Sequence, residues 1–257
     1  MDGDRHKATR KQMALHIAST KKEQEEVVIK TADKLLSAFF TNNCKLDLLT
    51  DIALPLWHAI SAIIIRNENN VQEIVDLIPS LFYPVLSIRK REQINNRLAD
   101  IIAHQGEECL LGIALATLGA RPFSGSLTLS LYDAAVQNKT GIVSALELGE
   151  GYKKSSLTYV DRICKSDSSV GPHHITAGER VRCVTQSSKY TEEQNISALY
   201  GFGAHVCLGR PISQFTFNLL KERLKRFDCK MIPEQIEMQD DCNPFTLPLR
   251  AIVSIEI

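Results

Sequence analysis

The segment YGFGAHVCLGRP, residues 200–211, constrains this chain more than any other, because an amphipathic helix is predicted directly after it, over 211–227. Its three glycines let the backbone adopt positive φ and pass close to a flat or bulky group. Cys207 precedes the helix, where free amide N–H groups and the helix dipole favour a thiolate. A buried structural cysteine in a glycine turn is the alternative, since free cysteines are usually inert.

A thiolate offered from a glycine loop against a planar partner is what axial ligation of heme iron requires. His205 stands two residues before Cys207, so it would lie at the rim of such a plane and meet a heme propionate. The loop therefore predicts a heme site with Cys207 as the iron ligand.

Composition limits the classes of function. Thirty basic and thirty acidic residues balance, so neither nucleic acid nor an anionic membrane is an expected partner. The longest apolar run, residues 109–120, is too short to span a bilayer, and the N-terminus is polar, without a secretory signal. Seven cysteines without a CxxC pair indicate neither a disulfide framework nor a zinc ribbon. We predict a reduced, cytoplasmic chain without a membrane span.

Hydrophobic periodicity predicts a mainly α fold with a small β region. We expect short strands within 159–184 and a strand over 245–257, and one long helix over 107–138 that is apolar nearly all round, covered on every side and kinked at Pro122. The other helices are expected over 21–40, 51–66, 71–105 (two helices, parted near Pro84) and 211–227.

The cysteine loop resembles the heme-binding signature of the cytochrome P-450 superfamily. That signature has an aromatic residue, a glycine four before the cysteine, a basic residue two before it and a glycine two after it. Gly203, His205, Cys207 and Gly209 fit, and Tyr200 stands where the family usually has phenylalanine. The resemblance implies heme b, bound between the central helix and the cysteine loop with its following helix.

The resemblance extends over nearly the whole chain. Residues 2–20 resemble the family's C helix, with His6 and Arg10 at the places that reach the heme propionates. Residues 44–64 are similar to the segment between the D and E helices, 107–138 to the central I helix, and 150–163 to the K helix and the strand after it. Arg162 falls where the family places an arginine on a propionate. Each of these residues alone is more often a surface charge.

Several departures from the family pattern are visible. The chain opens at the C helix, so the segments that roof the substrate pocket are missing, and a homo-oligomer that covers the distal side is one expectation. The segment 184–200 is short, which reduces the surface for a redox partner. Glu150 and Lys153 stand where the K helix has Glu-x-x-Arg, and lysine lacks the planar fork of arginine.

The central helix lacks the acid–alcohol pair that delivers protons to iron-bound oxygen. Arg121 and Pro122 instead resemble the arginine–proline pair of the fatty-acid peroxygenase branch, where the arginine holds the substrate carboxylate. A heme propionate or a protein carboxylate is an equal candidate partner for Arg121. Ser124 is a second candidate catalytic residue, although helical serines more often bond the carbonyl one turn back.

We therefore expect one heme-binding domain over 1–257: mainly helical over 1–158, short strands and a connecting loop over 159–200, the cysteine loop and its helix over 200–228, and strands over 229–257. The expected activity is oxidation of a small organic substrate, acidic if Arg121 binds it, with oxygen plus electrons from a redox partner or with peroxide. The alternatives are a heme-thiolate isomerase or dehydratase, and a non-catalytic partner protein of P-450-like fold.

Overall fold

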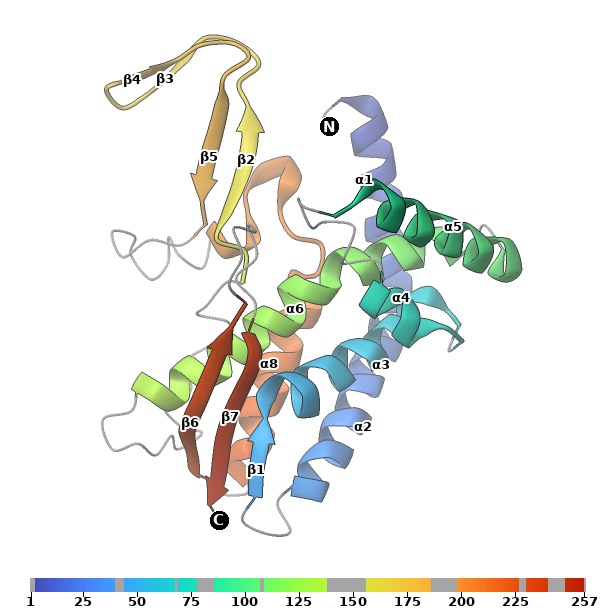
Figure 1. Ribbon diagram of the computed structural model, residues 1–257, viewed down its shortest axis with the longest axis vertical. Helices are drawn as coiled ribbons and strands as arrows, with labels where there is room; N and C mark the ends of the chain where they lie inside the picture. Colours follow the sequence, from blue (N-terminus) through green and yellow to red (C-terminus); the bar gives the residue numbers. More distant parts are fainter. Residues whose placement is uncertain are drawn as a thin grey trace.

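Helices make up most of the structure, a computed structural model that describes residues 3–39, 44–67, 69–77, 86–106, 109–137, 156–185, 198–226, 230–239 and 248–256. The helices are α1 (Asp4–Ser19), α2 (Lys21–Phe39), α3 (Leu54–Ile65), α4 (Val71–Leu77), α5 (Ile88–Gln105), α6 (Leu110–Gln137) and α8 (Arg210–Arg226) (Figure 1). A π-helical turn, η1 (Leu48–Ala53), leads into α3, and a 3-10 turn, η4 (Gly203–His205), lies in the cysteine loop.

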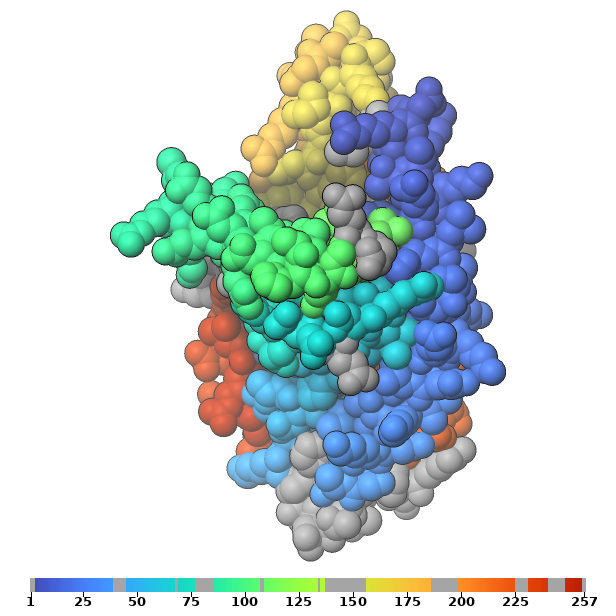
Figure 2. Space-filling model, turned by 90° about the vertical axis from the view of Figure 1, so that its right-hand side faces the viewer, coloured from blue at the N-terminus to red at the C-terminus, as the bar shows by residue number. Residues whose placement is uncertain are grey.

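The predicted mainly α fold with a small β region is confirmed. The predicted helices match α2, α3, α6 and α8, and the segment 71–105 divides into α4 and α5, as expected. Pro84, predicted to part them, lies outside the described residues. Figure 2 shows α5 projecting from the body of the molecule, where most of its residues are exposed.

A three-stranded antiparallel sheet joins distant parts of the chain. Its order is β1 (Cys44–Asp47), β7 (Pro248–Glu256), β6 (Lys230–Met238), so the last strand is central. The buried residues of β7 include Ala251, Val253 and Ile255, which share one face because they are alternate positions of the strand, and Ile252 on the other face. The β7 strand packs on η1 and α6, which places the sheet against the helical core.

Two smaller antiparallel pairs project from one end of the molecule (Figure 1). They are β2 (Tyr159–Ile163) with β5 (Arg180–Val184), and β3 (Ser168–Val170) with β4 (His173–Ile175). Most of their residues are exposed or only half-buried. Short strands over 159–184 were predicted, and these pairs confirm them.

The centre of the core is the contact between α3 and α6. A Cβ atom at Gly112 would lie 2.3 Å from the carbonyl oxygen of Ile64, and one at Gly119 would lie 2.3 Å from the ring of Trp57. Trp57 is held in place because its indole Nε1 donates to the carbonyl of Ala116 at 3.1 Å. The two glycines, seven residues apart, therefore allow a helix approach that no larger residue would permit.

The expectation that α6 is covered on every side is wrong. Leu110, Leu118 and Val136 are exposed, and Leu118 keeps 51% of its surface open to solvent in the middle of the helix. The helix continues through Pro122 to Gln137. Trp57 and the rest of α3 cover one side of α6, and another side stays open.

Two helical segments, Leu48–Ile65 and Leu110–Asp133, are long and apolar enough to cross a membrane by length and composition. About half of each is buried inside the fold, at 50% and 56%. Core helices of soluble proteins pass the same test, so the finding is weak evidence for a membrane span.

The Gly112→Ala substitution tests the close approach of α3 and α6. Alanine normally stabilises a helix interior relative to glycine. Here we expect the opposite sign, a loss of about 2 kcal/mol, because the new methyl group meets the backbone of α3. Denaturant unfolding measures the change, with the exposed Asn95→Ala in α5 as a control that should slightly stabilise. A more stable Gly112→Ala variant would contradict this packing.

His58 predicts how stability depends on pH. Burial lowers the pKa of His58 below its ordinary value, and the nearby Asp76 carboxylate, 3.8 Å from its Nε2, offsets only part of this effect. A histidine whose folded pKa is lowered contributes stability that is present above its unfolded pKa and lost as the pH falls through the folded pKa. We therefore expect the free energy of unfolding to decrease as the pH is lowered below about 6.5. His58→Gln should flatten this slope, whereas the exposed His174→Gln should not.

Candidate functional site

The N-terminal helix meets the cysteine loop across 196 positions of sequence. The guanidinium of Arg10 on α1 donates to the carbonyl of Val206, and the ring of His6 stacks on that of His205, with centroids 4.7 Å apart and planes at 26°. The structure thus brings together His6, Arg10, His205 and Cys207, four of the residues that the sequence predicts for one site.

The cysteine loop depends on its glycines. Gly201 and Gly203 have φ of 74° and 58°, a conformation that costs other residues free energy. A Cβ at Gly201 would also lie 3.2 Å from the carbonyl oxygen of His205. The loop closes through the amide of Cys207, which donates to the carbonyl of Tyr200 at 2.6 Å. The local geometry therefore fixes the cysteine at the start of α8.

Cys207 is an exposed residue, but the surrounding protein solvates a charge on its sulfur poorly. Burial nevertheless raises the pKa of its thiol, and the N–H groups of Gly209 and Arg210 and the charge of Arg10 offset only part of that effect. The residue as a whole is open to solvent, while its sulfur lies where little water stabilises the thiolate.

The amide donors that the sequence predicts at the helix start do favour the thiolate of Cys207, and the desolvation that outweighs them arises from the folded environment. A thiol in this state is protonated near neutral pH, so a metal that binds it must displace a proton.

The residues of this loop fit an iron porphyrin. A cysteine thiol is the soft ligand that heme-thiolate sites use, and two backbone N–H groups and Arg10 favour its charged form. A Cβ at Gly203 would meet nothing within 4 Å, so the loop leaves room for a bulky neighbour there, and one at Gly209 would lie 3.7 Å from the sulfur. Among the described residues, no group of three or more His, Cys, Asp or Glu could hold a metal ion by itself.

Tyr200 and Arg210 both act on the environment of the cysteine, Tyr200 as a buried residue and Arg210 as an exposed one. Tyr200 is 7% exposed, and no described residue forms a hydrogen bond with its buried hydroxyl. The guanidinium of Arg210 lies 5.2 Å from its ring centroid. Burial, and after it the charge of Cys207, raises the pKa of Tyr200 well above its ordinary value, and Arg210 acts in the opposite direction. Arg210 was not among the predicted site residues, although it lies within the segment 200–211, three residues after Cys207.

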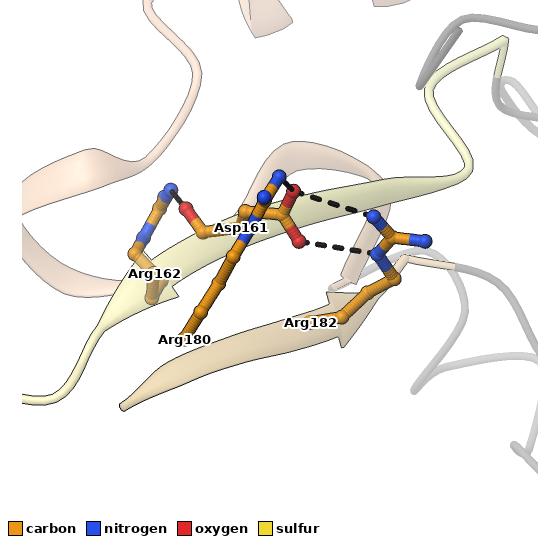
Figure 3. A network of polar contacts seen from close by, with 4 residues as sticks. All are labelled: Asp161, Arg162, Arg180 and Arg182. Atoms are coloured by element: carbon orange, nitrogen blue, oxygen red, sulfur yellow. Dashed lines mark hydrogen bonds and ion pairs between the residues drawn. The ribbon is translucent and has the colours of Figure 1, made fainter. Parts of the chain in front are cut away.

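The hydrogen bond described for Arg162 lies within its own strand and not at the cysteine loop. Arg162 is on β2, and its guanidinium donates to the carbonyl of Asp161 at 3.1 Å. Figure 3 shows that the carboxylate of Asp161 pairs instead with Arg180 and Arg182 from β5. No hydrogen bond or ion pair joins Arg162 to the cysteine loop or to α1 in the described part of the chain, so its role at a propionate stays a prediction.

The candidate catalytic residues lie in the middle of α6. The hydroxyl of Ser124 is buried and donates to the carbonyl of Ala120 at 2.6 Å, the backbone bond that the sequence analysis gave as the alternative. Arg121 is half-buried, and its carbonyl accepts from Ser156 at 3.4 Å. The catalytic roles of Ser124 and Arg121 are not tested by these contacts. Glu150 and Lys153 lie outside the described residues.

Comparison of the sequence with known proteins finds no matching family model and no matching curated protein. Comparison of the structure finds cytochromes P-450. The chain is similar to the versatile cytochrome P-450 enzyme CYP109B1 from Bacillus subtilis, with a TM-score of 0.76 and 16% identity over 99% of this chain and 85% of that one. It is also similar to the LnmA cytochrome P-450 hydroxylase of the leinamycin biosynthetic pathway of Streptomyces atroolivaceus, with a TM-score of 0.77 and 15% identity over 98% and 80%.

A third similar structure is P450BioI in complex with hexadec-9Z-enoic acid ligated acyl carrier protein, with a TM-score of 0.75 and 16% identity over 100% of this chain and 81% of that one. The chain therefore has the cytochrome P-450 fold, as the resemblance in sequence implied. Identity at this level establishes the fold and leaves the chemistry to the residues of the site.

The buried hydroxyl of Tyr200 predicts the effect of one conservative change. Tyr200→Phe removes a polar group that has no partner among the described residues, so the free energy of unfolding should rise by about 1 kcal/mol. Tyr132→Phe, on the partly exposed side of α6, is the control and should change it by less than about 0.5 kcal/mol. A destabilised Tyr200→Phe would mean that the hydroxyl has a stabilising partner, contrary to this geometry.

Proposed function

We propose that this chain, which has the cytochrome P-450 fold, binds heme b through the sulfur of Cys207 and oxidises a small organic molecule. The observation that carries the proposal is the exposed Cys207 in a loop shaped by glycines with positive φ, next to the cationic and imidazole side chains of α1. Thiolate-ligated heme supplies the activation of oxygen or peroxide.

The polar edge of the site would hold the two propionates. Two carboxylates on one edge of a porphyrin need several charged or polar donors. His6, Arg10 and His205 lie together next to the cysteine loop, and Arg162 is proposed as a fourth donor from β2. Gly203 and Gly209 would let the backbone approach the ring, because neither carries a Cβ.

Around the sulfur, the chain's own groups stabilise the charged form. The N–H groups of Gly209 and Arg210 and the charge of Arg10 act on Cys207. Burial opposes them and raises the pKa of the thiol, and a metal that binds the sulfur would replace its proton.

On α6, the residues of the open side would meet the substrate. Leu118 offers apolar surface, and Arg121 is proposed to orient an acidic or polar group of the substrate. Ser124 is proposed to assist by proton relay, which would require its hydroxyl to leave the carbonyl of Ala120. The acid–alcohol pair of most cytochromes P-450 is missing at this place, so peroxide is a candidate oxidant beside oxygen with external electrons.

Two other functions remain as alternative proposals. A heme-thiolate isomerase or dehydratase also works without the missing pair, and consumption of an external reductant during turnover would separate an oxygenase from it. A non-catalytic partner protein would not need Cys207, and failure to take up heme would favour it.

The proposed heme-thiolate function also predicts the partners of the chain. We propose a small-molecule substrate and, for the oxygen-dependent reaction, a redox partner protein. Since P450BioI was crystallised with a ligated acyl carrier protein, a carrier-bound acyl chain is a further form of substrate to test. A cytoplasmic location, a second copy over the distal side, and the absence of nucleic-acid and membrane partners stay predictions.

Heme uptake by the Cys207→Ser variant tests the proposal. The chain expressed with a heme supply should contain about one heme, with the absorption of a thiolate-ligated iron. Cys207→Ser should lose that absorption, because a serine oxygen is a poor replacement for the sulfur. Cys183→Ser changes another exposed cysteine, on β5, and should keep it. A colourless wild type, or unchanged bands in Cys207→Ser, would refute the proposal.

A further inference from the structure

None of the residues of α1 is buried, so apolar burial contributes little to its docking on the rest of the protein. Its half-buried residues recur every three or four positions, as on one side of a helix: His6, Thr9, Arg10, Met13, Ala14, His16 and Ile17. At the first end of this side, Arg10 donates to the carbonyl of Val206 and His6 stacks on His205. The docking of α1 therefore also needs a contact at its other end.

His16 supplies that contact at the C-terminus of α3. Its ring Nε2 donates to the carbonyl of Ile64 at 2.6 Å. Ile64 lies in the last turn of α3, where backbone carbonyls have no helical N–H partner and the helix dipole favours a donor or a cation. A Cβ at Gly112 would lie 2.3 Å from the same oxygen, so α6 packs there as well. Three helices, α1, α3 and α6, thus meet at one carbonyl group.

Arg66 joins the same two helix ends from the side of α3. It follows α3 as the C-cap with a φ of 59°, a left-handed conformation in which glycine is preferred. Its guanidinium donates to the hydroxyl of Ser19 at 3.1 Å, and that hydroxyl donates to the carbonyl of His16 at 2.8 Å. The chain keeps an arginine where glycine would fit the backbone better, and this arginine reaches the end of α1.

We propose that His16, assisted by Arg66, is a positioning residue for the heme site: it anchors one end of α1 on α3, and the helix then holds His6 and Arg10 against the cysteine loop. A helix rises 1.5 Å per residue, so His16 lies about 15 Å from His6 along the axis and acts through the helix. The inference rests on the proposed function, because His6 and Arg10 are the proposed propionate donors.

Amide hydrogen exchange on the full chain without heme tests the anchoring itself. His16→Ala should speed exchange over residues 8–14 by about tenfold, because α1 then loses a fixed end. His16→Gln should restore the wild-type rates, since the glutamine N–H can take the place of Nε2. His104→Ala is the matched control, because His104 bonds only the carbonyl of Asp100 on its own helix, at 2.6 Å, and it should leave α1 unchanged.

The positioning role is measured by the rate at which the heme-loaded chain releases heme to excess apomyoglobin. His16→Ala should release heme about tenfold faster than the wild type, with an unchanged thiolate spectrum because Cys207 is intact. His16→Gln and His104→Ala should release it at the wild-type rate. Arg66→Gly should also speed release, and its unfolding temperature should not fall, because glycine adopts positive φ without strain.

Exchange and heme release in His16→Ala that match the wild type, or a His16→Gln variant that restores neither, would overturn the inference and leave heme binding intact. Arg66→Gly that speeds release only with a lower unfolding temperature would also count against it, since general destabilisation would then explain the result. A wild type that takes up no heme would refute the proposed function and the role of His16 at a heme site, and the exchange rates would still show whether His16 anchors α1.

Discussion

The docking of α1 on the cysteine loop is the interaction on which the site depends. The guanidinium of Arg10 donates to the carbonyl of Val206, and His6 stacks on His205, so a helix from the start of the chain fixes a loop near its end. Charged donors to a backbone carbonyl are among the stronger hydrogen bonds of a protein. This contact gathers imidazole and guanidinium groups beside the one cysteine that the glycine loop presents.

The second constraint is the close approach of α3 and α6. Gly112 and Gly119 let the two helices touch, and Trp57 closes one side of α6 with a ring that is itself held by Ala116. The helix α6 also packs against α1. One side of α6 is thus fixed to the core while Leu118 and Pro122 stay partly open, which gives a rigid helix with an accessible face.

Local signals made much of this predictable from the sequence. Glycine spacing identified the cysteine loop, and hydrophobic periodicity located α2, α3, α6 and α8. The family resemblance, not the residues alone, predicted that His6 and Arg10 hold heme propionates. The structure places both residues against the cysteine loop, and their roles at a cofactor remain proposals.

What could not be predicted depends on tertiary structure. The pKa of Cys207 is dominated by desolvation, which only the folded environment sets. The open side of α6 was missed because an apolar pattern all round a helix predicts burial on every side. The hydrogen bonds that Trp57 and Ser156 donate to carbonyls of α6 could not be predicted either, because both residues lie in other parts of the chain. The pairing of Asp161 with Arg180 and Arg182 likewise required knowing the register of β2 and β5.

The most direct test of the account is X-ray absorption at the iron edge of the heme-loaded chain, which identifies the atoms bound to iron. The account predicts one sulfur ligand beside the porphyrin nitrogens, and the same sulfur in a variant that lacks every other cysteine. An iron bound only by nitrogen and oxygen atoms would contradict it.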